Sequence, residues 1–394
     1  MRIEGSVLLA SLLASGLALG AAATELRGTG DLGVIVERAT GSLLIVDTTQ
    51  RRVIDRVEGL GDLSHASVVF SRDARHAFVF GRDGGLSKVD LLTGAVAHRL
   101  IQGGNSIGGA ISQDGRIVAV ANYEPGGVRF FSTDDLAPVA EIPATMGADG
   151  ERSKVVGLED LPGNRFVFAL YDADAIWTVG LDGDALPEVQ RFAEVGALPY
   201  DALITPDGRY YIAGLFGEDG MVVLDLWDPT AEPFRILDGY GRGEEPLPVY
   251  KMPHLKGWSV AGDRIFLPAI GRHELLVVDR ATFEEVGRVA VHSQPVFAIA
   301  RPDGRQIWVN FAHPDNNVVQ VVDVPSLAVV AAFDLGPGVL HMEFAPKGEE
   351  VWISVRDENR IEIIDTRSLE RVAALDAESP SGIFFTARAH RLGY

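Results

Sequence analysis

A polar turn followed by an apolar strand recurs along the whole chain, and this repetition constrains the fold more than any other sequence feature. The turn has the form x-x-Asp-x-Arg, and successive copies are 41 to 55 residues apart. The copies, strong and degenerate together, end at Arg75, Arg116, Arg165, Arg209, Arg264, Arg305 and Glu349. A period in the forties is typical of architectures in which one small β-sheet is repeated.

A second series of apolar strands follows these turns and often closes on an aspartate, which we expect to form the next turn. These aspartates are Asp47, Asp90, Asp225, Asp279, Asp323 and Asp365. Two weaker members, Val128–Phe131 and Ala175–Val179, bring the series to eight. One four-stranded sheet cannot bury both of its faces alone, so such units stack around an axis. The sequence therefore predicts an all-β, eight-bladed β-propeller, with a seven-bladed one as the alternative.

The two ends of the repeat array are expected to meet. The first blade begins at Gly33–Arg38, and the last strand, near Ser381–Thr386, is predicted to join that first sheet and close the ring. The run from Gly28 to Gly33 matches the Gly-x-Gly-x-x-Gly fingerprint of dinucleotide sites. That fingerprint must open a helix, whereas a strand-like segment follows here. We interpret these glycines as shaping the entry into the first blade.

Charge and cysteine content exclude several classes of function. The 394-residue chain has 35 Lys and Arg against 55 Asp and Glu, a formal charge of -20. Nucleic-acid binding needs a basic footprint, so no nucleic-acid partner is expected. The chain has no cysteine, which excludes disulfides, iron–sulfur clusters and c-type haem attachment.

The N-terminal residues predict export. The stretch Ser6–Ala23 is almost wholly small or apolar, and Ala21–Ala23 fits a signal-peptidase site. We predict that residues 1–23 are a cleaved signal peptide and that residues 24–394 form a single propeller without a membrane anchor. A retained anchor is the alternative, which the alanine- and glycine-rich composition disfavours.

Aligned repeats place several polar residues at the lead-in to the innermost strands, where the loops of a propeller converge on its axis. Counting ten residues back from the last residue of each polar turn reaches His65, Ser106 and His254, and His341 falls within two residues of the same position. The same count reaches Val155, beside Lys154, and Pro199, beside Tyr200 and Asp201. We predict His254, His341, Tyr200 and Asp201 as proton carriers, since imidazole, carboxylate and phenol groups serve in acid–base catalysis.

A second set of loops, between the second and third strand of each blade, adds cations to the same face. These residues are Arg82, Arg272, His313 and Arg356. Imidazoles without thiolates suit a haem iron, and guanidinium groups pair with carboxylates. Together with Lys154 and Ser106, they predict a site for an acidic, planar ligand that carries a metal.

Long segments resemble the NirF family of heme d1 biosynthesis proteins. They are Gly59–Asp73, Gly104–Arg116, Gly239–Glu245, Asn310–Asp315 and Ser379–Phe385, and the resemblance extends over essentially the whole mature chain. It implies the eight-bladed d1-type propeller of cytochrome cd1 nitrite reductase and a periplasmic protein. The implied ligand is heme d1 or its precursor dihydro-heme d1, bound as substrate or product. Nitrite reductase and other heme d1 maturation proteins are the implied partners.

The resemblance also implies roles for individual residues. His65 matches the histidine that ligates the heme d1 iron in the reductase. On the opposite side, Pro295–Val296 replaces a Pro-His pair, so His313 or His341 would have to substitute. The expected function is a late modification of peripheral substituents of the macrocycle, by non-redox acid–base chemistry. A non-catalytic carrier is the alternative. Nitrite reduction and dehydrogenation are disfavoured because the chain lacks the c-type haem motif of enzymes with those activities.

Overall fold

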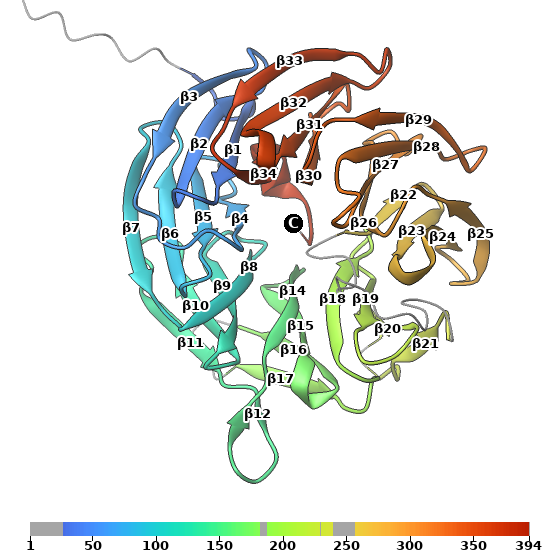
Figure 1. The fold of residues 1–394 in the computed structure, drawn as a ribbon. Coiled ribbons are helices and arrows are strands. Elements are labelled where there is room, and N and C mark those ends of the chain that lie inside the picture. The colour runs from blue at the N-terminus through green and yellow to red at the C-terminus, as the bar shows by residue number, and fades with distance from the viewer. Residues whose placement is uncertain (1–26, 182–186, 229, 239–256, 394) are drawn as a thin grey trace, which may run out of the picture.

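Eight four-stranded antiparallel sheets surround a central axis in the computed structural model (Figure 1). The structure describes residues 27–181, 187–228, 230–238 and 257–393. The prediction of eight blades is confirmed, and the seven-bladed alternative is wrong. The only helical elements in the described ranges are four short 3-10 turns, none of them able to span a membrane. The predicted signal peptide and His254 lie outside the described residues.

The strands run outward from the axis in chain order, except in blade 1. Blade 1 contains β34 (Pro380–Phe385), β1 (Leu32–Glu37), β2 (Ser42–Asp47) and β3 (Arg52–Val57). Blade 2 contains β4 (Ser67–Phe70), β5 (His76–Phe80), β6 (Gly85–Asp90) and β7 (Ala95–Ile101); blade 3 contains β8 (Asn105–Ile111), β9 (Ile117–Glu124), β10 (Val128–Ser132) and β11 (Pro138–Ile142); blade 4 contains β14 (Val155–Leu161), β15 (Arg165–Leu170), β16 (Ala175–Gly180) and β17 (Glu188–Phe192).

The remaining blades follow the same order. Blade 5 contains β18 (Pro199–Ile204), β19 (Tyr210–Leu215), β20 (Met221–Asp225) and β21 (Phe234–Ile236); blade 6 contains β22 (Ser259–Ala261), β23 (Arg264–Ala269), β24 (Glu274–Asp279) and β25 (Glu285–Ala290); blade 7 contains β26 (Pro295–Ala300), β27 (Gln306–Phe311), β28 (Val318–Asp323) and β29 (Ala328–Asp334); blade 8 contains β30 (Val339–Phe344), β31 (Glu350–Val355), β32 (Arg360–Asp365) and β33 (Arg371–Asp376). Outside the blades are the hairpin of β12 (Thr145–Met146) and β13 (Glu151–Arg152) and the 3-10 turns η1 (Tyr171–Ala173), η2 (Ile270–Arg272), η3 (Arg356–Glu358) and η4 (Thr386–His390).

The last strand closes the ring, as the sequence predicts. Strand β34 pairs with β1, and Gly33 lies opposite Phe385. A Cβ atom at Gly33 would lie 2.4 Å from the Phe385 ring, so this position needs glycine. The glycine-rich run therefore opens a strand that packs closely against the end of the chain, and it opens no helix.

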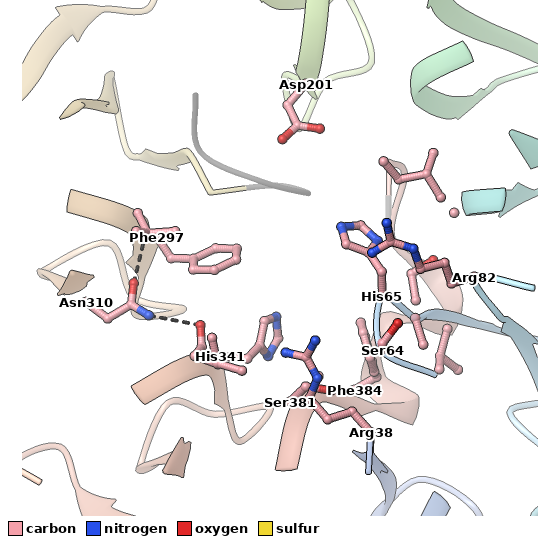
Figure 2. Close-up of a pocket in the computed structure, with 18 of the residues that line it drawn as sticks. Arg38, Ser64, His65, Arg82, Asp201, Phe297, Asn310, His341, Ser381 and Phe384 are labelled. Carbon is pink, nitrogen blue, oxygen red and sulfur yellow. Dashed lines mark hydrogen bonds between the residues drawn. The ribbon is translucent and has the colours of Figure 1, made fainter. Parts of the chain in front are cut away.

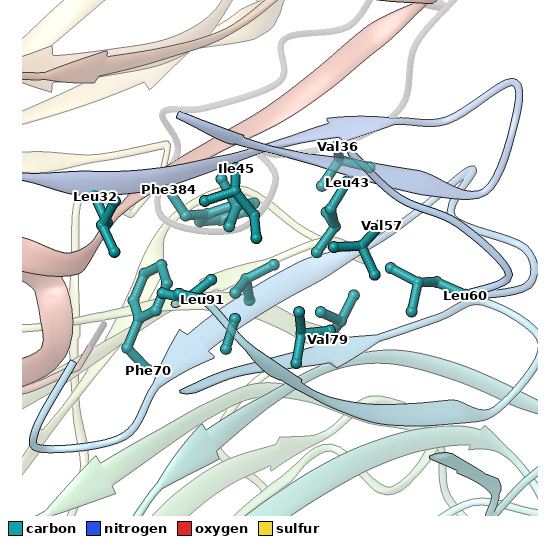
Figure 3. Packing of buried hydrophobic residues seen from close by; sticks show 14 of the residues in the cluster. Leu32, Val36, Leu43, Ile45, Val57, Leu60, Phe70, Val79, Leu91 and Phe384 are labelled. Carbon is teal, nitrogen blue, oxygen red and sulfur yellow. The ribbon is translucent and has the colours of Figure 1, made fainter. Parts of the chain in front are cut away.

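The core lies between neighbouring blades. Every residue of β2 is buried, whereas five of the six residues of the outermost strand β3 are exposed. Figure 3 shows the layer between blades 1 and 2, where Leu43 of β2, Phe70 of β4 and Phe384 of β34 belong to one buried cluster. Burial of these apolar faces is the main stabilising contribution, and it holds the inner strands rigidly around the axis.

The repeated aspartates form turns, as expected. In blade 2, the carboxylate of Asp90 accepts hydrogen bonds from the backbone N–H groups of Leu92 and Thr93. The same carboxylate forms a 2.8 Å ion pair with Arg75, the last residue of the polar turn. Two sequence motifs thus meet on one blade and fix the path of its chain.

Irregular pairing near the axis positions the functional side chains. In five innermost strands, two residues stand opposite a single residue of the next strand, which is the geometry of a β-bulge. The bulged pairs are Gly157–Leu158, Tyr200–Asp201, Val296–Phe297, Leu340–His341 and Ser381–Gly382. A bulge re-aims the side chains that it contains. With the exception of Tyr200, all of these residues border the central cavity.

Candidate functional site

A cavity of about 560 Å³ lies at the axis of the propeller (Figure 2). This volume falls within the range of small-molecule and cofactor sites. Its walls are largely apolar, with Ile107, Leu158, Val296 and Phe297 among the lining residues. Polar and charged side chains also line the cavity, which therefore suits a mostly apolar ligand that carries polar groups.

Hydrogen bonds from two side chains fix the bulges of blades 7 and 8. The Asn310 side chain accepts a 2.9 Å hydrogen bond from the Phe297 N–H and donates another of 2.9 Å to the Leu340 carbonyl. The Ser354 hydroxyl accepts a 2.9 Å hydrogen bond from the His341 N–H. In both bulges, a side-chain oxygen accepts from the N–H group of a bulge residue. These hydrogen bonds hold this part of the wall in place before a ligand binds.

His341 is held as a neutral hydrogen-bond donor. Its Nδ1 accepts a 3.2 Å hydrogen bond from the Ile383 N–H, and its ring packs between Phe297 and Phe384. Burial, with a contribution from Arg388, lowers the pKa of His341 to about 3. With Nδ1 accepting, the proton of the neutral ring sits on Nε2. This geometry suits neither the predicted proton-carrying role nor a second iron ligand.

His65 reaches the cavity from the loop before β4. Figure 2 shows its imidazole and the Phe297 ring entering from opposite sides. The preceding residue, Ser64, is anchored because its N–H donates a 2.8 Å hydrogen bond to the Asp62 side chain. The Arg82 N–H donates a further 2.8 Å bond to the Asp62 carbonyl. A partly buried imidazole on an anchored loop is well placed to be an axial ligand.

Four arginines border the same cavity: Arg38, Arg82, Arg356 and Arg388. Arg82 and Arg356 were predicted from the sequence, whereas Arg38 and Arg388 were not. Arg38, Arg82 and Arg356 follow the second strand of their blades, since β34 is the innermost strand of blade 1, and Arg388 lies in η4. Blade 1 lacks its own polar turn motif, so counting from that motif never reached Arg38. Counting from the end of the second strand would have found it.

Two buried carboxylates complete the wall. Asp201, at the bulge of β18, and Glu159, just after the bulge of β14, each have only 3% of their surface exposed. Asp201 was predicted as a proton carrier and lies in the cavity. Glu159 was missed, because bulges shift the residue facing the axis and the sequence pattern does not reveal them.

The other predicted residues lie in different surroundings. His313 is exposed and borders the cavity. Lys154 forms a 2.9 Å ion pair with Asp172, and the Ser106 hydroxyl donates to the Gly81 carbonyl. Neither of these two residues lines the cavity, and the exposed Arg272 does not line it either.

Tyr200 is also turned away from the cavity. Its hydroxyl lies 2.7 Å from that of Tyr123 in a hydrogen bond. Burial, reinforced by the negative charge of Asp201, raises the pKa of Tyr200 well above its usual value. The phenol therefore keeps its proton at neutral pH, and its surroundings do not suit the predicted proton-carrying role.

Comparisons with known proteins agree with this geometry. Residues 27–389 match the family model of the cytochrome D1 heme domain. The chain is 58% identical to Protein NirF of Stutzerimonas stutzeri, over 97% of this chain and 98% of the relative. It is 57% identical to Protein NirF of Pseudomonas aeruginosa, over 98% of each chain. Among solved structures, dihydro-heme d1 dehydrogenase NirN in complex with DHE superposes with a TM-score of 0.81 at 26% identity, covering 93% of this chain and 78% of NirN.

Proposed function

The chain belongs to the cytochrome D1 heme domain family, and from this premise we propose that it acts in the periplasm in heme d1 biosynthesis. In this proposal, the axial cavity binds a heme d1 precursor such as dihydro-heme d1, and the protein modifies peripheral substituents of the macrocycle. The observation that carries the proposal is the cavity itself, where three histidines and four arginines border mostly apolar walls. The predicted signal peptide supports the periplasmic location.

The residues present fit such a ligand. His65 supplies a nitrogen of the type that holds haem iron, and the apolar part of the wall suits the faces of a macrocycle. Arg38, Arg82 and Arg356 offer charge-assisted hydrogen bonds to its carboxylates. A bound tetrapyrrole would bring its own iron, so the protein has to contribute binding, orientation and proton transfer.

In this proposal, two buried carboxylates transfer the protons. Glu159 and Asp201 border the cavity and can exchange protons with a substituent that lies against them. His341 donates from Nε2 and orients an acceptor on the ligand without changing its own charge. The proposed chemistry is hydrolysis or elimination at a substituent, which needs proton transfer and no electron acceptor.

A carrier function is the second candidate, and one observation favours it. Of the four predicted proton carriers, Tyr200 is tied to Tyr123 and His341 to the Ile383 N–H. Neither is available for acid–base exchange at neutral pH. A preorganised cavity in which these two groups do not exchange protons suits a protein that holds the ligand and hands it to a partner such as nitrite reductase.

Anaerobic incubation with purified precursor, followed by mass spectrometry, tests both functions. We expect a mass change without any added acceptor, and we expect Glu159→Gln and Asp201→Asn to slow it by at least tenfold while binding persists. Tight binding with no mass change under any condition would establish the carrier. Product that forms only after a quinone or cytochrome is added would contradict the acid–base chemistry.

A further inference from the structure

The C-terminal residues cross the axial channel at one of its ends. Strand β34 pairs antiparallel with β1, so its last residue, Phe385, lies at the opposite end of the blade from Arg38, which follows β1. The chain continues from that end through η4 to Gly393. Figure 1 shows the ribbon after β34 turning into the centre of the ring. We call residues 386–393 the C-terminal segment.

The first half of the C-terminal segment is tied to blades 8 and 2. Arg388 forms an ion pair with Glu343, near the end of β30. Arg72, in the turn after β4, donates a hydrogen bond to the Ala389 carbonyl. Ala389 is only 2% exposed and belongs to the buried cluster between blades 1 and 2. These contacts hold the segment on the side of the ring where β34 ends.

The second half reaches the far side of the ring. The Gly393 N–H donates a 3.0 Å hydrogen bond to the Asp160 carboxylate of β14, in blade 4. Leu392 packs against the buried cluster between blades 4 and 5. Gly393 is itself buried, with a φ of +68°, a conformation that glycine adopts without strain. Because blade 5 lies opposite blade 1 in a ring of eight, the segment spans the axis.

This arrangement differs from an ordinary chain end. The terminal residues of most domains are poorly ordered unless contacts tie them down, and here four blades do so. Arg388 also borders the axial cavity, so the C-terminal segment forms part of the cavity wall. The side chains of Arg388 and Glu343 are only 11% and 9% exposed, which shows that water is largely excluded at this end.

We propose that the C-terminal segment is a plug that seals the axial channel at this end against water and small solutes. Exchange between the cavity and solvent is then confined to the opposite face, where the exposed Arg82 and His313 border the cavity. Under the proposed function, the tetrapyrrole enters and leaves at that face. The seal itself does not rest on that function, since it acts on any small solute.

Two single-cysteine reporters test the seal, and each introduced cysteine is the only thiol because the chain has none. Ile204→Cys lies under the segment, since a Cβ atom at Gly393 would lie 3.4 Å from the Ile204 Cβ. Ala202→Cys lies two residues earlier on the same face of β18 and lines the cavity. Both native side chains are buried. Mass spectrometry measures the rate at which each reporter reacts with methyl methanethiosulfonate.

The double variant Leu392→Asp/Gly393→Val is designed to release the plug. It places a charge in an apolar contact and a β-branched residue at a positive φ. The matched control, Leu92→Asp/Gly262→Val, makes the same two substitutions elsewhere. Leu92 is 40% exposed, and Gly262 has a φ of +65° with open space around its Cβ position. Amide hydrogen exchange of residues 386–393 shows whether the plug is seated in each protein.

We expect slow exchange of the segment in the wild type and the control, and fast exchange in the release variant. Both reporters should react about tenfold or more faster in the release variant than in the control, because access no longer requires local opening of the segment. If the double variant does not fold, Leu392→Asp alone is measured, with Leu92→Asp as its control.

Three results would overturn the proposal. They are fast exchange of the segment in the wild type, a segment that stays protected in the release variant, and equal reporter rates in the release variant and the control. Faster reaction at Ile204→Cys alone would also contradict the proposal, since the segment would then cover the end of the channel without sealing the cavity.

Discussion

The backbone N–H of Ile383 donates a 3.2 Å hydrogen bond to Nδ1 of His341. Ile383 belongs to β34, the strand that closes the ring, whereas His341 lies in the bulge of β30. This contact between blades 8 and 1 therefore also fixes the tautomer of the histidine in the cavity. The strand that closes the ring by pairing with β1 thus also sets the hydrogen-bonding character of the site.

This relationship predicts how stability depends on pH. The pKa of His341 is lowered to about 3 in the folded protein, against an ordinary value of 6.5. Between these values the unfolded chain binds a proton that the folded chain does not, so stability falls as pH drops below 6.5. The loss attributable to His341 at pH 4 is at most about 3 kcal/mol. Urea unfolding between pH 4 and 8 measures it.

The variant His341→Gln provides the comparison. It removes the titrating group, so the decline of stability between pH 6.5 and 4 should become shallower than in the wild type. The pKa of His76 is also lowered by burial, and its contribution is common to both proteins. Parallel curves for wild type and variant over this range would show that His341 is not held neutral.

The C-terminal segment predicts a second effect. Arg388 of η4 pairs with Glu343 of β30, and the two side chains are only 11% and 9% exposed. The same guanidinium lies 5.2 Å from the centre of the Phe384 ring. Removing one partner leaves a buried charge uncompensated, so Arg388→Gln should lower the free energy of unfolding by roughly 3 kcal/mol. Chemical denaturation measures this value.

Two further variants show whether the charge is responsible. The double variant Arg388→Gln/Glu343→Gln should recover a substantial part of the lost stability, because neither charge remains. Arg116→Gln breaks an exposed pair with Asp114 and should cost less than about 1 kcal/mol. Equal losses for Arg388→Gln and Arg116→Gln would be inconsistent with a buried ion pair.

The fold could be predicted because it is a sum of local repeats. Seven of the eight blades have a polar turn, such as the one at Arg75, and six have an apolar strand that ends in a turn-forming aspartate, such as Asp90. Those signals are contiguous in the chain, so the number of blades and the closure by β34 followed from spacing alone. Blade 1 shows the limit, because it has no motif of its own and its arginine, Arg38, was overlooked.

The site was harder to predict because it depends on contacts between blades. The spacing of the repeats predicted that His65, Arg82, Asp201 and His341 lie at one site, and all four line the cavity. The spacing could not show that the Ile383 N–H donates a hydrogen bond to Nδ1 of His341. Burial and hydrogen bonding decide which of these groups can titrate, and both arise from segments far apart in sequence.

The bulge of blade 7 gives a third prediction. The Asn310 side chain accepts from the Phe297 N–H and donates to the Leu340 carbonyl, so Asn310→Ala leaves two partly buried backbone groups without these partners. We expect a loss of roughly 1–3 kcal/mol in unfolding free energy and weaker heme d1 binding, because Phe297 is no longer held in the wall. Asn310→Asp keeps the acceptor and should lose less. A fully stable Asn310→Ala with unchanged binding would show that the bulge needs no such support.

The last prediction concerns His65. If its imidazole ligates the iron of the bound tetrapyrrole, His65→Ala should weaken binding of heme d1 by at least tenfold and shift the Soret band. The control is His98→Ala, which removes an exposed histidine of β7 and should change neither property.

One measurement tests the central claim most directly: an anaerobic absorption titration of heme d1 into wild type, His65→Ala and His98→Ala. The account predicts a saturable spectral shift for wild type and His98→Ala, and an altered spectrum with weakened binding for His65→Ala. An unchanged spectrum and affinity in His65→Ala would contradict the account, since the ligand would then be held without the histidine of the axial cavity.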